Sequence, residues 1–198
     1  MKRSNVLVGL CLLVLGAYVL AIPPSGYHLL KKIPFGAAPG GLEYFDYITF
    51  DNSTRRVYLS HGSEVKVVDA DKGSVVGTIS DLKRCHGVVV LNDLGRGFIT
   101  DGETGQVVIF DLKTFKTLGQ IKAGRNPDSI LYDPASKRLF VFNGGSKDAT
   151  VMDPAKGTVV TTLPLGGAPE QAVADGKGMY TTTSKTRMRS WRSIPANS

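Results

Sequence analysis

The sequence repeats itself with a period of 42 residues, and this repeat constrains the fold more than any other feature. Once in each unit an aspartate ends an apolar run, at Asp69, Asp111 and Asp153. An aliphatic residue in the last apolar run of each unit keeps the same spacing, at Ile79, Ile121 and Leu163. A period of about 40–45 residues with four strands per unit is typical of β-propellers.

Residues 98–121 show what one unit contains. In FITDGETGQVVIFDLKTFKTLGQI, β-branched and aromatic runs alternate with turns rich in Gly and Asp, which is the pattern of antiparallel hairpins. No stretch of useful length has the periodicity of an amphipathic helix. We therefore predict an all-β fold, a β-propeller of four-stranded antiparallel blades. The repeats cover 44–81, 85–122 and 126–164, with the start of a fourth at 168–180, so we expect a partial, open arc of about three to four blades.

Three pentapeptides are variants of one another and begin with Arg56, Arg96 and Arg138. A small polar turn follows each of them, and a V-x-D-x-x-x-G-x-V segment spans 67–75. Over residues 27–180 the chain resembles the YVTN family of β-propeller repeat proteins, which are exported proteins of bacteria and archaea. This resemblance implies the fold but says little about function, because propellers host unrelated activities.

The N-terminal 21 residues have the pattern of a secretory signal peptide. Lys2 and Arg3 precede an uncharged apolar run, and Val19 and Ala21 fit a small-x-small cleavage site. We expect a periplasmic or secreted protein with no membrane span after the signal is removed. Cys85 would then be the sole cysteine, which excludes an intrachain disulfide.

The net charge of +7 does not indicate a nucleic-acid partner. The signal peptide carries two of the excess positive charges and residues 181–198 carry four, which leaves a charge of +1 on residues 22–180. Such a body offers no basic stripe for phosphates, so we expect no nucleic-acid binding.

Two segments at the ends of the chain depart from the regular repeat. Residues 27–36 resemble the last strand of a repeat that has no earlier strands. Such a strand would complete the final blade of a closed propeller, but in an open, truncated arc it would have no blade to complete. Residues 181–198 contain no acid and almost no aliphatic side chains, so we expect an irregular tail. Read from the third base of the Met179 codon, with permitted synonymous codons, the same segment can encode VYNHLEDKNEVVEIDS, a continuation of the repeat. We therefore expect a tail translated out of frame and a truncated propeller.

No motif of a known catalytic or metal centre is present, and we assign no catalytic residue, no metal and no cofactor. Cys85 and His86 are adjacent, but neighbours in a strand point to opposite faces, which favours structural roles over a metal pair. His28 and His61 have no evident partner in the sequence, and we expect both at the surface.

The candidate binding site follows from topology. Loops that enter the inner strands surround one mouth of a propeller's channel, where ligands tend to bind. The equivalent polar residues in successive repeats are Asp46, His86, Asp128 and Glu170, and Arg125 and Asn126 precede the third of these. Acids and one imidazole in a ring could hold a cation or a basic ligand. Alternatively, Asp128 only caps a turn.

These observations favour a non-catalytic exported propeller that serves as a binding or scaffold module. Its partner would be a protein, a peptide or a small molecule that the sequence does not name. The alternative is a fragment of a propeller enzyme, either lactonase-like or related to quinone-dependent dehydrogenases.

Overall fold

The computed structural model describes residues 26–41, 43–184 and 188–192. The expected signal peptide lies outside these residues. Two compact units divide the chain, residues 1–32 and residues 33–198, and in the first unit the described residues 26–32 form no helix or strand. Within the described residues, no helix is long and apolar enough to cross a membrane.

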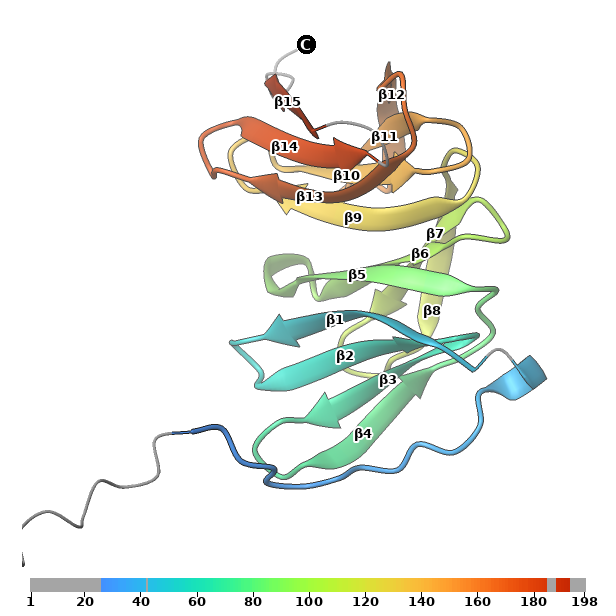
Figure 1. The fold of residues 1–198 in the computed structure, drawn as a ribbon, viewed down its shortest axis with the longest axis vertical. Helices are drawn as coiled ribbons and strands as arrows, with labels where there is room; N and C mark the ends of the chain where they lie inside the picture. Colours follow the sequence, from blue (N-terminus) through green and yellow to red (C-terminus); the bar gives the residue numbers. More distant parts are fainter. Residues whose placement is uncertain (1–25, 42, 185–187, 193–198) are drawn as a thin grey trace, which may run out of the picture. The chain divides into compact units, whose positions relative to one another are not determined.

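The second unit consists of short antiparallel strands in four sheets, which we call blades 1 to 4 (Figure 1). Blade 1 contains β1 (Phe45–Asp51), β2 (Arg56–His61), β3 (Glu64–Asp69) and β4 (Ser74–Ile79). Blade 2 contains β5 (Cys85–Leu91), β6 (Arg96–Asp101), β7 (Gln106–Asp111) and β8 (Thr117–Lys122). Blade 3 contains β9 (Pro127–Asp133), β10 (Arg138–Asn143), β11 (Asp148–Asp153) and β12 (Thr158–Pro164). Blade 4 contains β13 (Pro169–Ala174), β14 (Met179–Ser184) and β15 (Met188–Arg192). Two 3-10 turns, η1 (Pro39–Gly41) and η2 (Asn92–Leu94), lie between strands.

Each blade is a meander in which consecutive strands pair. The inner strands β1, β5, β9 and β13 lie side by side, and the later strands of each blade extend away from them (Figure 1). This arrangement confirms the predicted all-β fold, a partial and open propeller arc.

Aspartates that end the third strand of a blade form the turns that set the repeat. Asp69 Oδ1 accepts hydrogen bonds from the amides of Asp71 and Lys72, at 3.1 and 2.8 Å. Asp111 and Asp153 accept the equivalent pairs in the next two blades. Aspartate is favoured at such positions because its short side chain bonds the backbone two and three residues ahead. The period of 42 therefore reflects a repeated turn.

The blades are held to one another by apolar side chains from both faces of each sheet. Three buried clusters occur in sequence order, and each joins one blade to the next. Tyr58, Phe98 and Phe140 hold the equivalent central place in the three clusters and are fully buried. Burying a side chain of this size stabilises the fold by about 1.5–3 kcal/mol, so these contacts contribute substantially to holding neighbouring blades together.

The structure differs from two expectations at the ends of the chain. Residues 27–36 form no strand, and Tyr27 and Leu30 are exposed. Residues 181–184 and 188–192, expected in an irregular tail, lie in β14 and β15, which pair from Met179–Arg192 to Thr183–Met188. Pairing with β13 and β14 satisfies backbone groups whatever the side chains are, which polarity alone does not reveal. Residues 185–187 and 193–198 of the expected tail lie outside the described residues.

Candidate binding site at the start of the inner strands

Every inner strand has a β-bulge or irregularity between its first and fourth residues. The ladder register shifts between Phe45 and Ile48 in β1, and equivalent shifts occur in β5, β9 and β13. Bulges of this kind re-aim side chains next to functional sites. The second residues of the four strands are the predicted set Asp46, His86, Asp128 and Glu170.

Hydroxyl groups fix the backbone at these positions across the blade boundaries. Ser60 donates to the carbonyl of His86, Thr100 donates to the carbonyl of Asp128 at 2.5 Å, and Ser129 donates to the carbonyl of Glu170. Each bond reaches from one blade to the inner strand of the next. The backbone at His86, Asp128 and Glu170 is therefore held by the same kind of hydrogen bond in each blade, and their side chains take no part in it.

Three of the predicted side chains meet in one cluster. One oxygen each from Asp46 and Asp128 and one ring nitrogen of His86 all lie within 4.8 Å of one another. His86 Nδ1 is 2.5 Å from Asp46 Oδ2 and 3.9 Å from Asp128 Oδ1. Gly87 makes this approach possible, because a Cβ there would lie 3.1 Å from the Asp128 carbonyl and 2.9 Å from the Ile130 side chain.

His86 is buried, with 6% of its surface exposed, while Asp46 is exposed. Its Nε2 has no hydrogen-bond partner among the described residues. That nitrogen faces Gly102, whose Cβ would lie 2.7 Å from Nε2 and 3.1 Å from Asn126 Oδ1. A glycine at this position therefore lets the His86 imidazole and the Asn126 amide pack closely against the backbone of Gly102.

Two tyrosines, Tyr44 and Tyr47, are close to the cluster, and the pKa of Tyr47 reflects the negative charge of its carboxylates. The Tyr44 ring centroid lies 6.1 Å from that of His86, and its hydroxyl donates to the Cys85 carbonyl at 3.1 Å. Burial first, and then the negative charges of Asp128, Asp46 and Glu170, raise the pKa of Tyr47 to about 12. The start of the inner strands is therefore an electronegative region.

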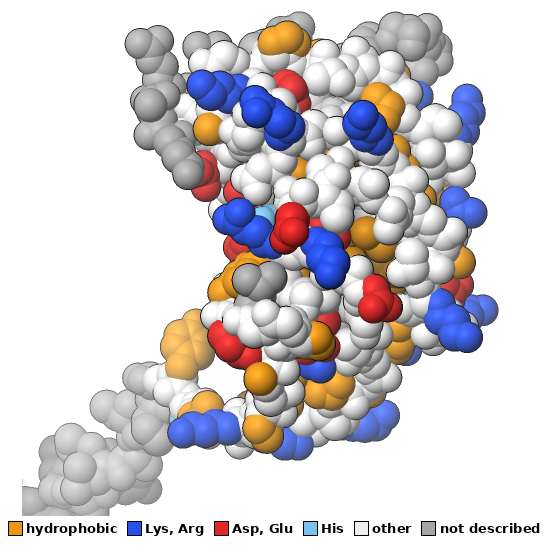
Figure 2. Space-filling model, turned by 90° about the vertical axis from the view of Figure 1, so that its right-hand side faces the viewer, with side chains coloured by type: hydrophobic (Ala, Val, Ile, Leu, Met, Phe, Trp, Pro, Cys, Tyr) orange, Lys and Arg blue, Asp and Glu red, His pale blue; other side chains and the backbone are white. Residues whose placement is uncertain are grey.

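Figure 2 views the end of the blades at which the inner strands begin. Acidic, basic and histidine surface adjoin near the middle of this view. The face therefore presents a compact polar patch among uncharged side chains.

The other predicted residues are placed differently. The carboxylate of Glu170 does not belong to the three-residue cluster, although its charge reaches Tyr47. Arg125 is exposed and donates to the Gly145 carbonyl at 3.1 Å, so its guanidinium is engaged with the loop between β10 and β11. Asn126 has a positive φ of 49° and accepts the Gly144 amide, which shapes the turn into β9.

The expectation that His61 lies at the surface is wrong, whereas His28 is exposed as predicted. His61 is 1% exposed and stacks on Phe45 at a centroid distance of 4.4 Å. Its Nδ1 lies 3.2 Å from Glu64 Oε1 and its Nε2 lies 3.3 Å from Glu43 Oε2. Both ring nitrogens thus have carboxylate partners. Nothing in the local sequence around His61 indicates Glu43, because that contact depends on how the entering loop returns to blade 1.

Cys85 is an inert structural thiol. It is fully buried and its Sγ lies 3.2 and 3.1 Å from the carbonyls of Gly62 and Glu64. Burial raises the pKa of the thiol to about 12, so it is protonated at neutral pH. This agrees with the structural role that the sequence favours.

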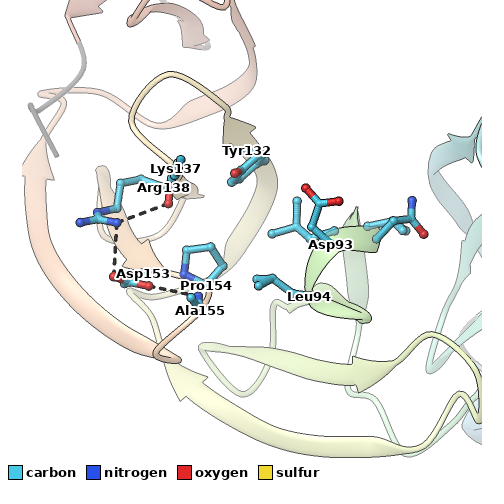
Figure 3. Close-up of a pocket in the computed structure, with 11 residues that line it drawn as sticks. Asp93, Leu94, Tyr132, Lys137, Arg138, Asp153, Pro154 and Ala155 are labelled. Atoms are coloured by element: carbon cyan, nitrogen blue, oxygen red, sulfur yellow. Dashed lines mark hydrogen bonds and ion pairs between the residues drawn. The ribbon is translucent and has the colours of Figure 1, made fainter.

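Sequence reasoning missed a pocket of about 650 Å³ at the other end of the inner strands, between blades 2 and 3. Leu94 of η2 and Pro154 after β11 face each other across it, and Tyr132 of β9 adds a third wall (Figure 3). Arg138 at its edge is 3.3 Å from Asp153, so this pair is internally neutralised. A pocket assembled from two blades has no local sequence signal.

Together the sheets and the inner-strand cluster define a β-propeller arc with a polar site at one end of its channel-facing strands. A scan of family models and a search of curated proteins both find no match. Among solved structures, the chain is similar to hydrazine synthase of Kuenenia stuttgartiensis, with a TM-score of 0.65 and 19% identity. The match covers 79% of this chain and 45% of that chain, so this chain spans less than half of its structural neighbour. The likeness extends to 1063 solved chains, and it supports the fold alone.

Proposed function

We propose that this protein is an exported, non-catalytic propeller of the YVTN type that binds a cationic ligand at the start of its inner strands. The observation that carries the proposal is the convergence of Asp46, His86 and Asp128 from three successive blades. Two carboxylates beside a buried imidazole form a site for positive charge, because oxygen and nitrogen lone pairs converge there. The signal-peptide pattern at the N-terminus supports export to the periplasm or the exterior.

The geometry favours binding over catalysis. A general base must reach the proton that it removes, but His86 Nε2 is buried beneath Gly102 and its Nδ1 is engaged with Asp46. The neighbouring thiol, Cys85, is buried and protonated, so it is no nucleophile. The described residues of this site therefore supply neither an accessible histidine base nor a nucleophilic thiol.

A peptide series tests the proposal. Peptides that differ only in one central Lys, Gln or Glu would be titrated against the full chain by fluorescence anisotropy. We expect the Lys peptide to bind most tightly and the Glu peptide least, because the site carries negative charge. The double variant Asp46→Asn/Asp128→Asn should weaken Lys-peptide binding by about tenfold or more. Equal affinity for the Lys and Gln peptides would contradict a cationic ligand.

A further inference from the structure

We infer that Asp46, His86 and Asp128 form a binding site for a divalent transition-metal ion of the Zn²⁺ class. The inference rests on the proposed function, since it names the cation that the site takes. The sequence alone led us to assign no metal, because the three ligands lie 40 and 42 residues apart and match no metal motif. Only the stacking of three blades brings them together.

The distances are close to those that such an ion requires. A tetrahedral ion with ligand bonds of about 2.0–2.1 Å places neighbouring donor atoms roughly 3.4 Å apart. Between His86 Nδ1 and Asp46 Oδ2 the separation is 2.5 Å, and it must open by roughly 0.9 Å. Between His86 Nδ1 and Asp128 Oδ1 it is 3.9 Å, and it must close by roughly 0.5 Å. The first change falls on Asp46, the more exposed of the two aspartates.

The donor set selects the class of ion. One imidazole with two carboxylates is a mixed nitrogen and oxygen set, which suits Zn²⁺ and its transition-metal neighbours. Ca²⁺ takes 6–8 oxygen ligands and Mg²⁺ near-ideal octahedral oxygen coordination, so a site with an imidazole and two aspartates favours neither. Three protein ligands would leave one coordination position for a ligand or water.

The buried Nε2 of His86 gives independent support. In the structure, Nδ1 is engaged with Asp46 and Nε2 has no partner among the described residues, which is costly for a buried polar atom. If Nδ1 binds a metal, a neutral imidazole carries its proton on Nε2. Asn126 Oδ1, an acceptor, lies near the same point at Gly102 as Nε2. Histidine ligands commonly donate their other ring N–H to an oxygen, so a metal-bound His86 would present an Nε2–H donor on the side where the Asn126 acceptor lies.

Two other groups in the chain serve as internal controls. His61 also sits between two carboxylates, but both of its nitrogens are already partnered and Glu64 pairs with Lys66 at 2.9 Å. Glu170 occupies the equivalent place in blade 4 but lies outside the cluster. The proposal therefore concerns one arrangement of residues and not a general affinity of histidines and acids for metal.

The test is calorimetric titration of the purified full chain with Zn²⁺, with Mg²⁺ as the comparison ion. We expect one Zn²⁺ per chain, and binding at least about tenfold weaker in Asp128→Asn and in His86→Asn. The variants Glu170→Gln and His28→Asn should bind Zn²⁺ as the wild type does. Asp128 is only partly buried, so Asp128→Asn keeps the test valid if His86→Asn does not fold. Co²⁺ absorption adds a direct readout, since a tetrahedral site gives intense visible bands that Asp128→Asn should remove.

The Lys peptide from the preceding series separates the two proposals. Zn²⁺ binding that is lost in Asp128→Asn supports the metal site. Peptide binding without Zn²⁺ binding would overturn the metal site and leave the cationic-ligand function standing. Failure of both probes would overturn both, and Zn²⁺ binding that is equal in wild type and Asp128→Asn would also exclude this site.

Discussion

At the scale of single residues, hydrogen bonds of polar side chains add to the apolar contacts between blades. Asp51, at the end of β1, accepts four hydrogen bonds, from the amide and hydroxyl of Ser53, the hydroxyl of Thr54 and the side-chain amide of Asn92. Asn92 belongs to η2 of the next blade. One carboxylate thus closes a turn and joins two blades.

Replacing this carboxylate should be costly. Asp51→Ala leaves several donors without an acceptor near a buried position, and we expect the free energy of unfolding to fall by about 1–3 kcal/mol. Urea denaturation followed by circular dichroism would measure it. Asp71→Ala is the control, because Asp71 makes an exposed ion pair with Arg55 that should contribute little to stability. Equal losses in both variants would contradict the role given to Asp51.

Cys85 should resist chemical modification in the folded protein. Its thiol is buried and its pKa is raised to about 12, so iodoacetamide at pH 8 should not label it, as followed by peptide mass spectrometry. In denaturant the same site should react fully. Rapid labelling without denaturant would mean that the environment of β5 is wrongly described.

At the scale of elements, turns are predictable from sequence and contacts between blades are not. The aspartates at Asp69, Asp111 and Asp153 act within three residues of themselves, so their spacing predicts the strand ends. The carboxylate partners of His61 could not be predicted, because the contact with Glu43 depends on how the segment before β1 packs against β2. The predicted mouth residues were found because each repeat places them at the same point, but topology did not say that Glu170 would stand outside the cluster.

Acid should weaken the fold through these turns. Hydrogen bonds from the amide and hydroxyl of Thr114 lower the pKa of Asp111, and the Lys72 amide and ammonium lower that of Asp69. A carboxyl whose folded pKa is lowered contributes stability that is complete above its ordinary pKa of about 4 and is lost as the pH falls through the folded value. Thermal melting at pH 7, 4.5 and 3 should show this loss. The melting temperature of Asp111→Asn should lie below that of the wild type at pH 7, and this difference should shrink at pH 3. A difference that stays constant with pH would show that the Asp111 carboxylate is not the source of the acid sensitivity.

Packing between blades can be tested at two equivalent glycines. Gly77 in β4 lies against Phe115 of blade 2, whose Cδ2 would be 2.2 Å from an added Cβ. Gly119, 42 residues later in β8, has no atom within 4 Å of that point. We expect Gly77→Ala to lower the free energy of unfolding by about 1–3 kcal/mol and Gly119→Ala to be nearly neutral. The same measurement on both variants checks this, and similar effects would argue against close packing of Phe115 on blade 1.

At the scale of the whole molecule, the blade unit has an apolar face at its first blade. Val88 and Val90 of β5 pack on blade 1, and Ile130 and Tyr132 of β9 pack on blade 2. The ladder register makes Ile48 and Phe50 of β1 their equivalents, yet these side chains are 66% and 47% exposed. Exposed apolar patches of this kind promote association.

We therefore expect the purified chain to self-associate with rising concentration in size-exclusion chromatography with light scattering. The double variant Ile48→Lys/Phe50→Lys should shift the protein toward the monomer. Leu118→Lys, at an exposed apolar position on the outer strand β8, should leave the distribution unchanged. A wild-type chain that stays monomeric at high concentration would contradict association through Ile48 and Phe50 of blade 1.

The most direct test of the account is anomalous diffraction at the zinc edge from crystals of the Zn²⁺-loaded full chain. The account predicts a peak within about 2–2.2 Å of His86 Nδ1 and of carboxylate oxygens of Asp46 and Asp128. It also predicts four adjacent blades whose inner strands carry the bulges at these residues. Anomalous peaks only at His28, His61 or lattice contacts, and none at Asp46, His86 and Asp128, would contradict it.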